Sequence, residues 1–460
     1  MDVEPETIGS EGATSQEEDS RPELGYLVEA QDFGRDVSLC SRSKCQEAFA
    51  MLGPSIAACI IFLPPVIGNG LGATGVIGQR GSGPFCLLAF MCALFVSSHL
   101  LCCIRRPRMR RHELLLLSVL LCCGFLLCLP VLLSLSTGWQ LEAKVKALPL
   151  PSKPLRPRSG AFSFGAWLLG PLAGEVGTCS LGPPQRSVPF KHVGPPLNCS
   201  VHGFVKKCGW SGPLFMDFYM PFVQEGPTDV RRQPAIFFVH GGWWWAGDRT
   251  WHHSCFFDYF RKRGFVLASV GYRLTRNGYV GSDIVEDVVD GLKFFLDHSA
   301  EFGVDDNRVV VMGESAGGHL AVLASLLMPV GTVRVVVDLW GIQELLQGYK
   351  SEIRDNWPEG YMLFCDGLPK YKPGCFENMT TTTHVTRRSP PMLVLHGTAD
   401  SVVAAEHSVA LAHHLEKSGV PQLLALAPGQ AHGCWGVAAG ICIQWLLFAS
   451  EHFIQWSFQA

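Results

Sequence analysis

The chain has 460 residues, enough for one large domain and a further region. Its formal net charge is −3 and 17% of its residues are charged, so the sequence gives no electrostatic reason to expect nucleic acid as a partner. The hydrophobic fraction is 48% and the mean hydropathy is +0.21, which is high for a soluble protein and indicates membrane segments.

Long apolar segments near the N-terminus are typical of membrane-spanning helices. Residues 84–104 and 114–137 are uncharged, and each is long enough to cross a bilayer as a helix. A third candidate span lies within residues 48–79, where prolines, an asparagine and glycines interrupt the run and leave an interfacial or re-entrant segment as the alternative. The acidic stretch 1–47 is predicted to be a disordered tail.

The loop between the two clear spans indicates the sidedness of the protein. Residues 105–111 contain five arginines, which favour the cytosol under the positive-inside rule. The chain after residue 137 is then lumenal or extracellular, and N-glycosylation sequons at Asn198 and Asn378 agree with that side. We expect a multi-pass glycoprotein of the endomembrane system (endoplasmic reticulum or Golgi) or the cell surface, with the lipid bilayer as a partner through its N-terminal helices.

The cysteines indicate disulfides rather than a metal site. No C-x-x-C pair has zinc-like spacing, so no metal is expected. Eight of the 18 cysteines lie beyond residue 170, in the part expected to be lumenal, where some could pair. Cys365 and Cys375 form the first pair to test.

The second half of the chain has the pattern of an α/β domain. Residues 138–212, rich in Pro, Gly and Ser, are predicted to be a linker with lead-in strands, and residues 213–460 a folded domain. Within this domain apolar strand-like runs alternate with helical patterns, which predicts a mostly parallel sheet flanked by helices. The last helical run, 437–456, is apolar enough to resemble a span, but Gln444 and Glu451 interrupt it and favour a packed core helix.

The predicted strands are 214–221, 235–239, 265–270, 309–312, 333–339, 392–395 and 423–426, and the predicted helices are 283–303, 316–327, 404–418 and 437–456.

One motif predicts a nucleophile. The sequence Gly-Glu-Ser-Ala-Gly at 313–317 fits G-x-S-x-G, and an apolar strand precedes it while a helix follows. Glycines permit the sharp turn that presents Ser315 at the end of the strand. The N-terminus of the following helix favours developing negative charge there. We therefore predict that Ser315 is the nucleophile of a serine hydrolase.

A serine hydroxyl needs a base and an acid to activate it, and in this fold they follow in the order Ser, acid, His. Asp400 follows one predicted strand, and His432 follows the next. We predict that these two complete a triad with Ser315. Asp338, at the end of the strand before that of Asp400, is the alternative acid.

The loop after strand 235–239 is predicted to stabilise the oxyanion. It begins His-Gly-Gly-Trp-Trp-Trp, and the glycines let backbone N–H groups approach a tetrahedral intermediate. The N–H groups of Gly241, Gly242 and Ala316 are the predicted donors. Trp243 and Trp244 are predicted to line a substrate pocket, although at least one tryptophan of the row is expected only to pack the loop. Glu314, directly before Ser315, is a further predicted pocket residue.

These residues resemble a known group of enzymes. The segments HGGWWWAGD, YRL, GVDDNRVVVMGESAGGHLA and HGTADSVV are similar to the α/β-hydrolase esterases of the hormone-sensitive-lipase and feruloyl-esterase-like (BD-FAE-like) branch. That branch includes prenylcysteine methylesterases and kynurenine formamidase. The resemblance covers roughly residues 213–456 and implies an α/β-hydrolase fold with a Ser-Asp-His triad and no organic cofactor. The chain departs from many members at Trp243, where they carry a third glycine.

The stretch 341–390 between two predicted strands is long enough to be a cap over the active site. The leading hypothesis for the function is a carboxylic-ester hydrolase that acts on a small-molecule ester with a hydrophobic or small acyl group. The alternatives are an arylformamidase, a prenylcysteine methylesterase, or an inactive hydrolase fold that serves as a binding module. A channel is disfavoured because the spans carry no intramembrane charge, and the oligomeric state is left open.

Overall fold

The computed structural model describes residues 138–147, 182–195, 211–222, 232–250, 254–352, 358–427, 430–433 and 441–459. The predicted tail and the three predicted spans lie outside these ranges, so they stay predictions. Among the residues that are described, no helix has both the length and the apolar character to cross a bilayer.

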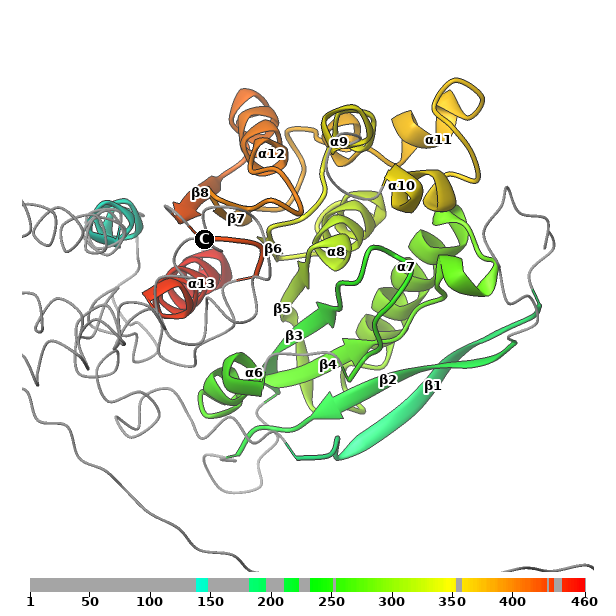
Figure 1. Cartoon of the computed structure of the whole chain (residues 1–460). Coiled ribbons are helices and arrows are strands. Elements are labelled where there is room, and N and C mark those ends of the chain that lie inside the picture. Colours follow the sequence, from blue (N-terminus) through cyan, green and yellow to red (C-terminus); the bar gives the residue numbers. More distant parts are fainter. Residues whose placement is uncertain are drawn as a thin grey trace, which may run out of the picture. The chain divides into compact units, whose positions relative to one another are not determined.

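The described part is built on one sheet with the strand order β1-β2-β4-β3-β5-β6-β7-β8 (Figure 1). The strands from β4 to β8 in this order are parallel, whereas β2 pairs antiparallel with both β1 and β4. The bounds are β1 Arg186–Val193, β2 Gly212–Tyr219, β3 Gln233–Val239, β4 Val266–Val270, β5 Val304–Glu314, β6 Val335–Leu339, β7 Met392–Gly397 and β8 Gln422–Ala427. β1 lies within the range predicted to hold lead-in strands.

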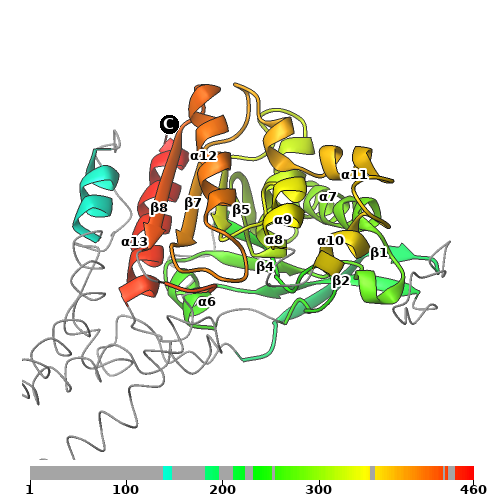
Figure 2. The same cartoon turned by 45° about the horizontal axis from the view of Figure 1, so that its top comes forward.

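Helices cover both faces of the sheet, as the predicted α/β class requires (Figures 1 and 2). One face carries α7 (Gly281–Asp297), α8 (Ala316–Leu327) and α12 (Glu406–Lys417), and the other carries α6 (Ser254–Arg261) and α13 (Ile441–Gln459). Because the central strands are buried on both faces, β4 and β6 consist entirely of buried residues. This double burial is why they read as continuous apolar runs in the sequence.

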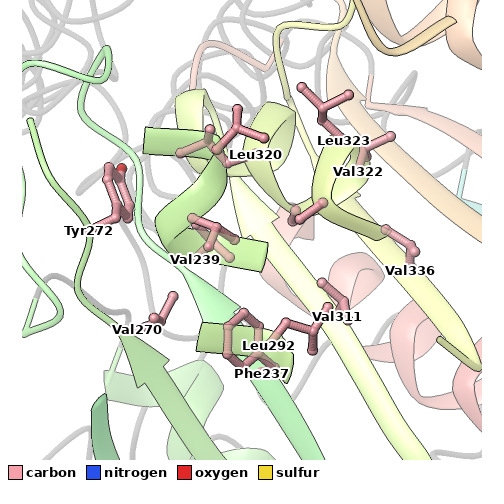
Figure 3. Close-up of a cluster of buried hydrophobic side chains, with 14 of the residues drawn as sticks. Phe237, Val239, Val270, Tyr272, Leu292, Val311, Leu320, Val322, Leu323 and Val336 are labelled. Atoms are coloured by element: carbon pink, nitrogen blue, oxygen red, sulfur yellow. The ribbon is translucent and has the colours of Figure 1, made fainter. Parts of the chain in front are cut away.

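The core beneath α8 fixes the position of Ser315, the predicted nucleophile. Figure 3 shows Phe237, Val311 and Val336 from three neighbouring strands below Leu320 and Leu323 of α8. All five side chains are fully buried, and each such burial contributes about 1.5–3 kcal/mol. The helix that begins beside Ser315 is therefore held against the sheet along its length.

The segment predicted to be a cap forms short helices between β6 and β7. They are α9 (Leu345–Glu352), α10 (Pro358–Phe364), α11 (Pro373–Asn378) and the 3₁₀ helix η3 (Thr381–His384). A disulfide joins Cys365 to Cys375, the pair that the sequence put first. Cys365 directly follows α10 and Cys375 lies within α11, so the disulfide links the two helices.

A short helix over residues 138–146 lies beside α13 (Figures 1 and 2). Its Leu141 and Val145 are buried in the same apolar cluster as Trp445 of α13. The sequence did not predict this helix, because its apolar face is only two residues wide. α13 itself is a packed core helix, and its buried Glu451 accepts a hydrogen bond of 2.8 Å from Arg263 Nε.

Candidate active site

The strand β5 and the helix α8 meet at Ser315 in a strained turn. Ser315 has φ 54° and ψ −125°, a conformation that side-chain-bearing residues rarely adopt and that costs about 1–3 kcal/mol. The flanking glycines make the turn feasible: a Cβ on Gly313 would lie 2.1 Å from the carbonyl oxygen of Gly317, and a Cβ on Gly317 would lie 2.2 Å from that of His240. The turn presents the Ser315 side chain at the end of the sheet.

The three residues predicted to form a triad lie within hydrogen-bonding distance of one another. His432 Nε2 is 3.0 Å from Ser315 Oγ, and His432 Nδ1 is 2.7 Å from Asp400 Oδ2. Because a carboxylate only accepts, Nδ1 carries the proton and Nε2 is left to accept the Ser315 hydroxyl. The alternative acid, Asp338, instead accepts the Gly341 N–H at 3.1 Å through Oδ1. The carboxylate that meets His432 is therefore that of Asp400.

The Asp400 carboxylate is enclosed by hydrogen-bond donors. Oδ1 accepts the N–H groups of Val402 and Val403 at 2.8 and 2.9 Å, and Oδ2 lies 3.1 Å from His396 Nε2 in addition to His432. Burial of this carboxyl would by itself raise its pKa, but the hydrogen bonds from His396 and His432 outweigh burial and hold the pKa well below its ordinary value. Asp400 is thus kept ionised and fixed in orientation.

The predicted oxyanion loop lies directly against Ser315. A Cβ on Gly241 would be 3.3 Å from Ser315 Cβ and 3.1 Å from the Glu314 carbonyl oxygen, so a larger residue could fit only if these neighbours moved by a few tenths of an ångström. Gly242 has φ 120°, which favours glycine as well. Ala316 is the first residue of α8, where a backbone N–H lacks an acceptor within the helix. The structure therefore brings the predicted donors to the same strand end as Ser315.

His240, which opens this loop, is buried and structural. Burial lowers its pKa to about 4, so the ring is neutral at pH 7. Its Nδ1–H donates to the Gly241 carbonyl oxygen at 2.8 Å, and its own carbonyl oxygen accepts the Tyr272 hydroxyl at 2.7 Å. The Tyr272 ring stacks on the imidazole at 4.2 Å between centroids. These contacts hold the start of the loop in place.

The comparisons with known proteins identify a family that matches the second half of the chain. Residues 216–415 match the family model described as BD-FAE. These residues belong to an α/β-hydrolase domain of the BD-FAE-like esterase branch, the BD-FAE-like domain. This finding confirms the resemblance that the sequence motifs indicated.

The relatives of the BD-FAE-like domain include enzymes from plants and bacteria. A probable isoprenylcysteine alpha-carbonyl methylesterase of Arabidopsis thaliana is 27% identical over 238 residues, which are 47% of this chain and 48% of that protein. The esterase LipC of Mycobacterium tuberculosis is 30% identical over 221 residues, 44% of this chain and 53% of that protein. The chain therefore spans about half the length of these curated relatives. A solved esterase structure from Thermogutta terrifontis is 27% identical and covers 48% of this chain and 80% of its own, with a TM-score of 0.40.

The prediction that Trp244 lines the substrate pocket does not hold. Its side chain is fully buried, its ring packs on Phe364 of the cap at 4.4 Å between centroids, and its Nε1–H donates to His319 Nδ1 at 3.2 Å. Trp244 therefore fastens the oxyanion loop of the BD-FAE-like domain to the cap. Trp243 is half-buried, and its ring contacts Tyr361 edge-on at 5.6 Å, while Glu314 is half-buried beside Ser315. For these two residues the pocket role stays a prediction.

Two histidines of the BD-FAE-like domain that matter for the site were not singled out from the sequence. His319 on α8 accepts from Trp244 and donates from Nε2 to the Met379 carbonyl oxygen at 2.7 Å, and burial lowers its pKa to about 4. It therefore links the oxyanion loop, the nucleophile helix and the cap as a neutral ring. The other is His396, four residues before Asp400, a spacing that could have drawn attention to it. Among the described residues no group of His, Cys, Asp and Glu side chains is arranged to hold a metal ion.

Proposed function

We propose that this chain is a membrane-anchored serine hydrolase that cleaves carboxylic esters through Ser315, His432 and Asp400. The observation that carries the proposal is the continuous line of hydrogen bonds from Ser315 Oγ through the His432 imidazole to the buried, ionised Asp400. It begins at a strained turn beside the N–H groups of Gly241 and Ala316. The esterase names of the relatives support the same reaction class.

The proposed mechanism follows from these positions. His432 Nε2 takes the proton of the Ser315 hydroxyl as Oγ attacks the ester carbonyl carbon. Asp400 holds the imidazole in the required tautomer and stabilises the imidazolium. The N–H groups of Gly241, Gly242 and Ala316 bind the oxyanion, and His432 then protonates the departing alcohol. Water, deprotonated by the same imidazole, cleaves the acyl-enzyme and releases the acid.

The decisive experiment replaces the nucleophile in the full chain in detergent. Ser315→Ala is expected to lower hydrolysis of p-nitrophenyl acyl esters by at least about 10³-fold and to abolish labelling by a fluorophosphonate probe. The matched control is Ser325→Ala on the same helix, whose hydroxyl donates to the Ala321 carbonyl oxygen and does not contact His432. Equal turnover in the wild type and the Ser315 variant would refute the proposal. A series of acyl-chain lengths then separates small from hydrophobic acyl groups.

We also propose that the hydrolase domain is lumenal or extracellular and that the predicted spans 84–104 and 114–137 anchor it. The disulfide between Cys365 and Cys375 supports an oxidising compartment. Asn378 of the second sequon is exposed at the end of α11, so a glycan could attach there. Asn378→Gln is expected to remove a glycosidase-sensitive shift in gel mobility. Degradation of the domain by protease added to the cytosolic side of sealed vesicles would contradict this topology.

The alternative substrates are an arylformamide and a prenylcysteine methyl ester, the second because of the name of the Arabidopsis relative. A prenylated protein presents its methyl ester on the cytosolic face of a membrane. The sidedness of the domain therefore discriminates: a lumenal domain favours a soluble or lumenal-leaflet carboxylic ester over a prenylated protein. A direct comparison of kcat/KM on the three substrate classes would rank them.

A further inference from the structure

We propose that His396 is a positioning residue of this site. His396 and His432 both contact Oδ2 of Asp400, so His396 weakens the electrostatic interaction between this carboxylate and His432. The inference rests on the proposed function and adds a residue to it. His396 lies one residue before the end of β7, its side chain is fully buried, and it does not reach Ser315. It can therefore act only through Asp400.

The contacts of His396 determine which of its nitrogens carries a proton. Nε2 lies 2.9 Å from the Val403 carbonyl oxygen and 3.1 Å from Asp400 Oδ2. Both are acceptors, so Nε2 must be protonated and donates to the two together. Nδ1 lies 2.7 Å from the Ser408 hydroxyl on α12, which donates to it in the neutral imidazole. Every polar atom of the buried ring is thereby used, and the ring is held between β7, the loop after it and α12.

The consequence for the site comes from the shared oxygen. Oδ2 accepts from His396 at 3.1 Å and from His432 at 2.7 Å, so the two donors divide the negative charge of one atom. Without the His396 donor, more of that charge would stabilise the His432 imidazolium, and His432 would hold its proton to higher pH. His396 thus favours the neutral His432 that can accept the Ser315 proton.

Other ionisable groups near His396 must be separated from this effect. Asp338 at the end of β6 interacts electrostatically with His396, and burial raises the pKa of Asp338 to about 7. Lys144 on the helix 138–146 lines the same cavity, of about 200 Å³, as His396. Because its pKa lies near neutral pH, Asp338 needs a control of its own.

The test is the pH dependence of kcat/KM for a p-nitrophenyl ester, measured on the full chain in detergent between pH 5 and 9. The acid limb reports the essential base of the free enzyme, which is His432 in this mechanism. His396→Leu is expected to move this limb upward by about half to one pH unit, which lowers kcat/KM by about 3- to 10-fold at pH values on the limb. His396→Gln, whose amide nitrogen can replace Nε2 as the donor, is expected to keep the limb at its wild-type position.

Three further variants make the outcome unambiguous. His414→Leu removes an exposed histidine of α12 that bonds only within its own helix, and it should change nothing. Asp338→Asn is introduced alone and together with His396→Leu. The acid limb of the double variant must lie above that of Asp338→Asn by the same interval that separates His396→Leu from the wild type. If His396→Leu does not fold, His396→Asn, whose amide is too short to reach Oδ2, must give the same shift.

An unchanged acid limb in a folded His396→Leu variant would overturn the inference, as would an equal shift in His396→Gln. Either outcome leaves the proposed function intact as long as the wild type, but not Ser315→Ala, is labelled by the fluorophosphonate probe. If the wild type itself shows no turnover that depends on Ser315, it is the proposed function that fails.

Discussion

A carboxyl group in the middle of the sheet should make the stability of the protein depend on pH. Asp338 lies within β6 and is fully buried. Its Oδ1 accepts the Gly341 N–H, while Oδ2 has no hydrogen-bond partner. Burial raises the pKa of Asp338 from 3.8 to about 7, although His396, Gln343 and the Gly341 N–H act in the opposite direction. The folded protein therefore binds this proton more tightly than the unfolded chain does.

The sign and the size of the effect follow from linkage. The stability contributed by the protonated carboxyl is fully present below about pH 4, where both states are protonated, and it is lost as pH rises through about 7. At roughly 1.4 kcal/mol per pH unit, the interval between the two pKa values corresponds to about 4 kcal/mol. This figure is an upper bound for what the ionised Asp338 costs the folded state at pH 8.

Asp338→Asn removes the charge while it keeps the shape and the acceptor for the Gly341 N–H. We expect a gain of about 1.7 kcal/mol at pH 5, which is little more than one pH unit above the unfolded pKa of 3.8, and a gain of up to about 4 kcal/mol at pH 8. The gain at pH 8 is a rise of roughly 8 °C in Tm for a domain of this size. Thermal unfolding of the full chain in detergent, followed by tryptophan fluorescence at both pH values, measures it. Asp306→Asn, at an exposed position, serves as the control. A variant with equal changes in Tm at pH 5 and pH 8, or with a lower Tm at pH 8, would show that this reasoning is wrong.

Three further predictions concern the framework of the site. Trp244→Ala should cost about 3–5 kcal/mol of folding free energy in a thermal unfolding assay, because it empties a fully buried position and removes the donor to His319. Gly317→Ala should abolish fluorophosphonate labelling, since its Cβ would meet backbone oxygens at 2.2 Å, whereas Gly374→Ala, which meets nothing within 4 Å, should be labelled normally. Cys365→Ser should lower stability by about 2–3 kcal/mol, because it opens the loop to Cys375, and its Tm should match that of the double serine variant.

The central part of the fold could be predicted because its local patterns have direct physical causes. Strands buried on both faces are continuous apolar runs, and β3 to β7 were found in this way. The turn at Ser315 was predictable because glycines stand where β5, α8 and the loop at Gly241 approach one another closely. In both cases a few neighbouring residues determine the structure.

Other features could not be predicted because they depend on contacts between distant segments. The row of tryptophans gave no indication of which ring would turn inward, since that depends on Phe364 and His319, which lie far away in the chain. Likewise, the helix at 138–146 is stabilised by packing against α13. Its apolar face is too narrow for the helix to be predicted from its own sequence.

The choice between Asp338 and Asp400 illustrates the limit most clearly. Asp338 lies near the end of one predicted strand and Asp400 follows another. Because the strands are parallel, both carboxylates are brought to the same edge of the sheet. The sheet order places β8 next to β7 and not next to β6, so a histidine after β8 meets first the acid that follows β7. Asp400 lies three residues beyond Gly397 at the rim, where the side chain of His432 is 20% exposed, whereas Asp338 is enclosed inside β6. A carboxylate that must stay ionised needs the donors found at the rim, and the enclosed one is left to bind its proton.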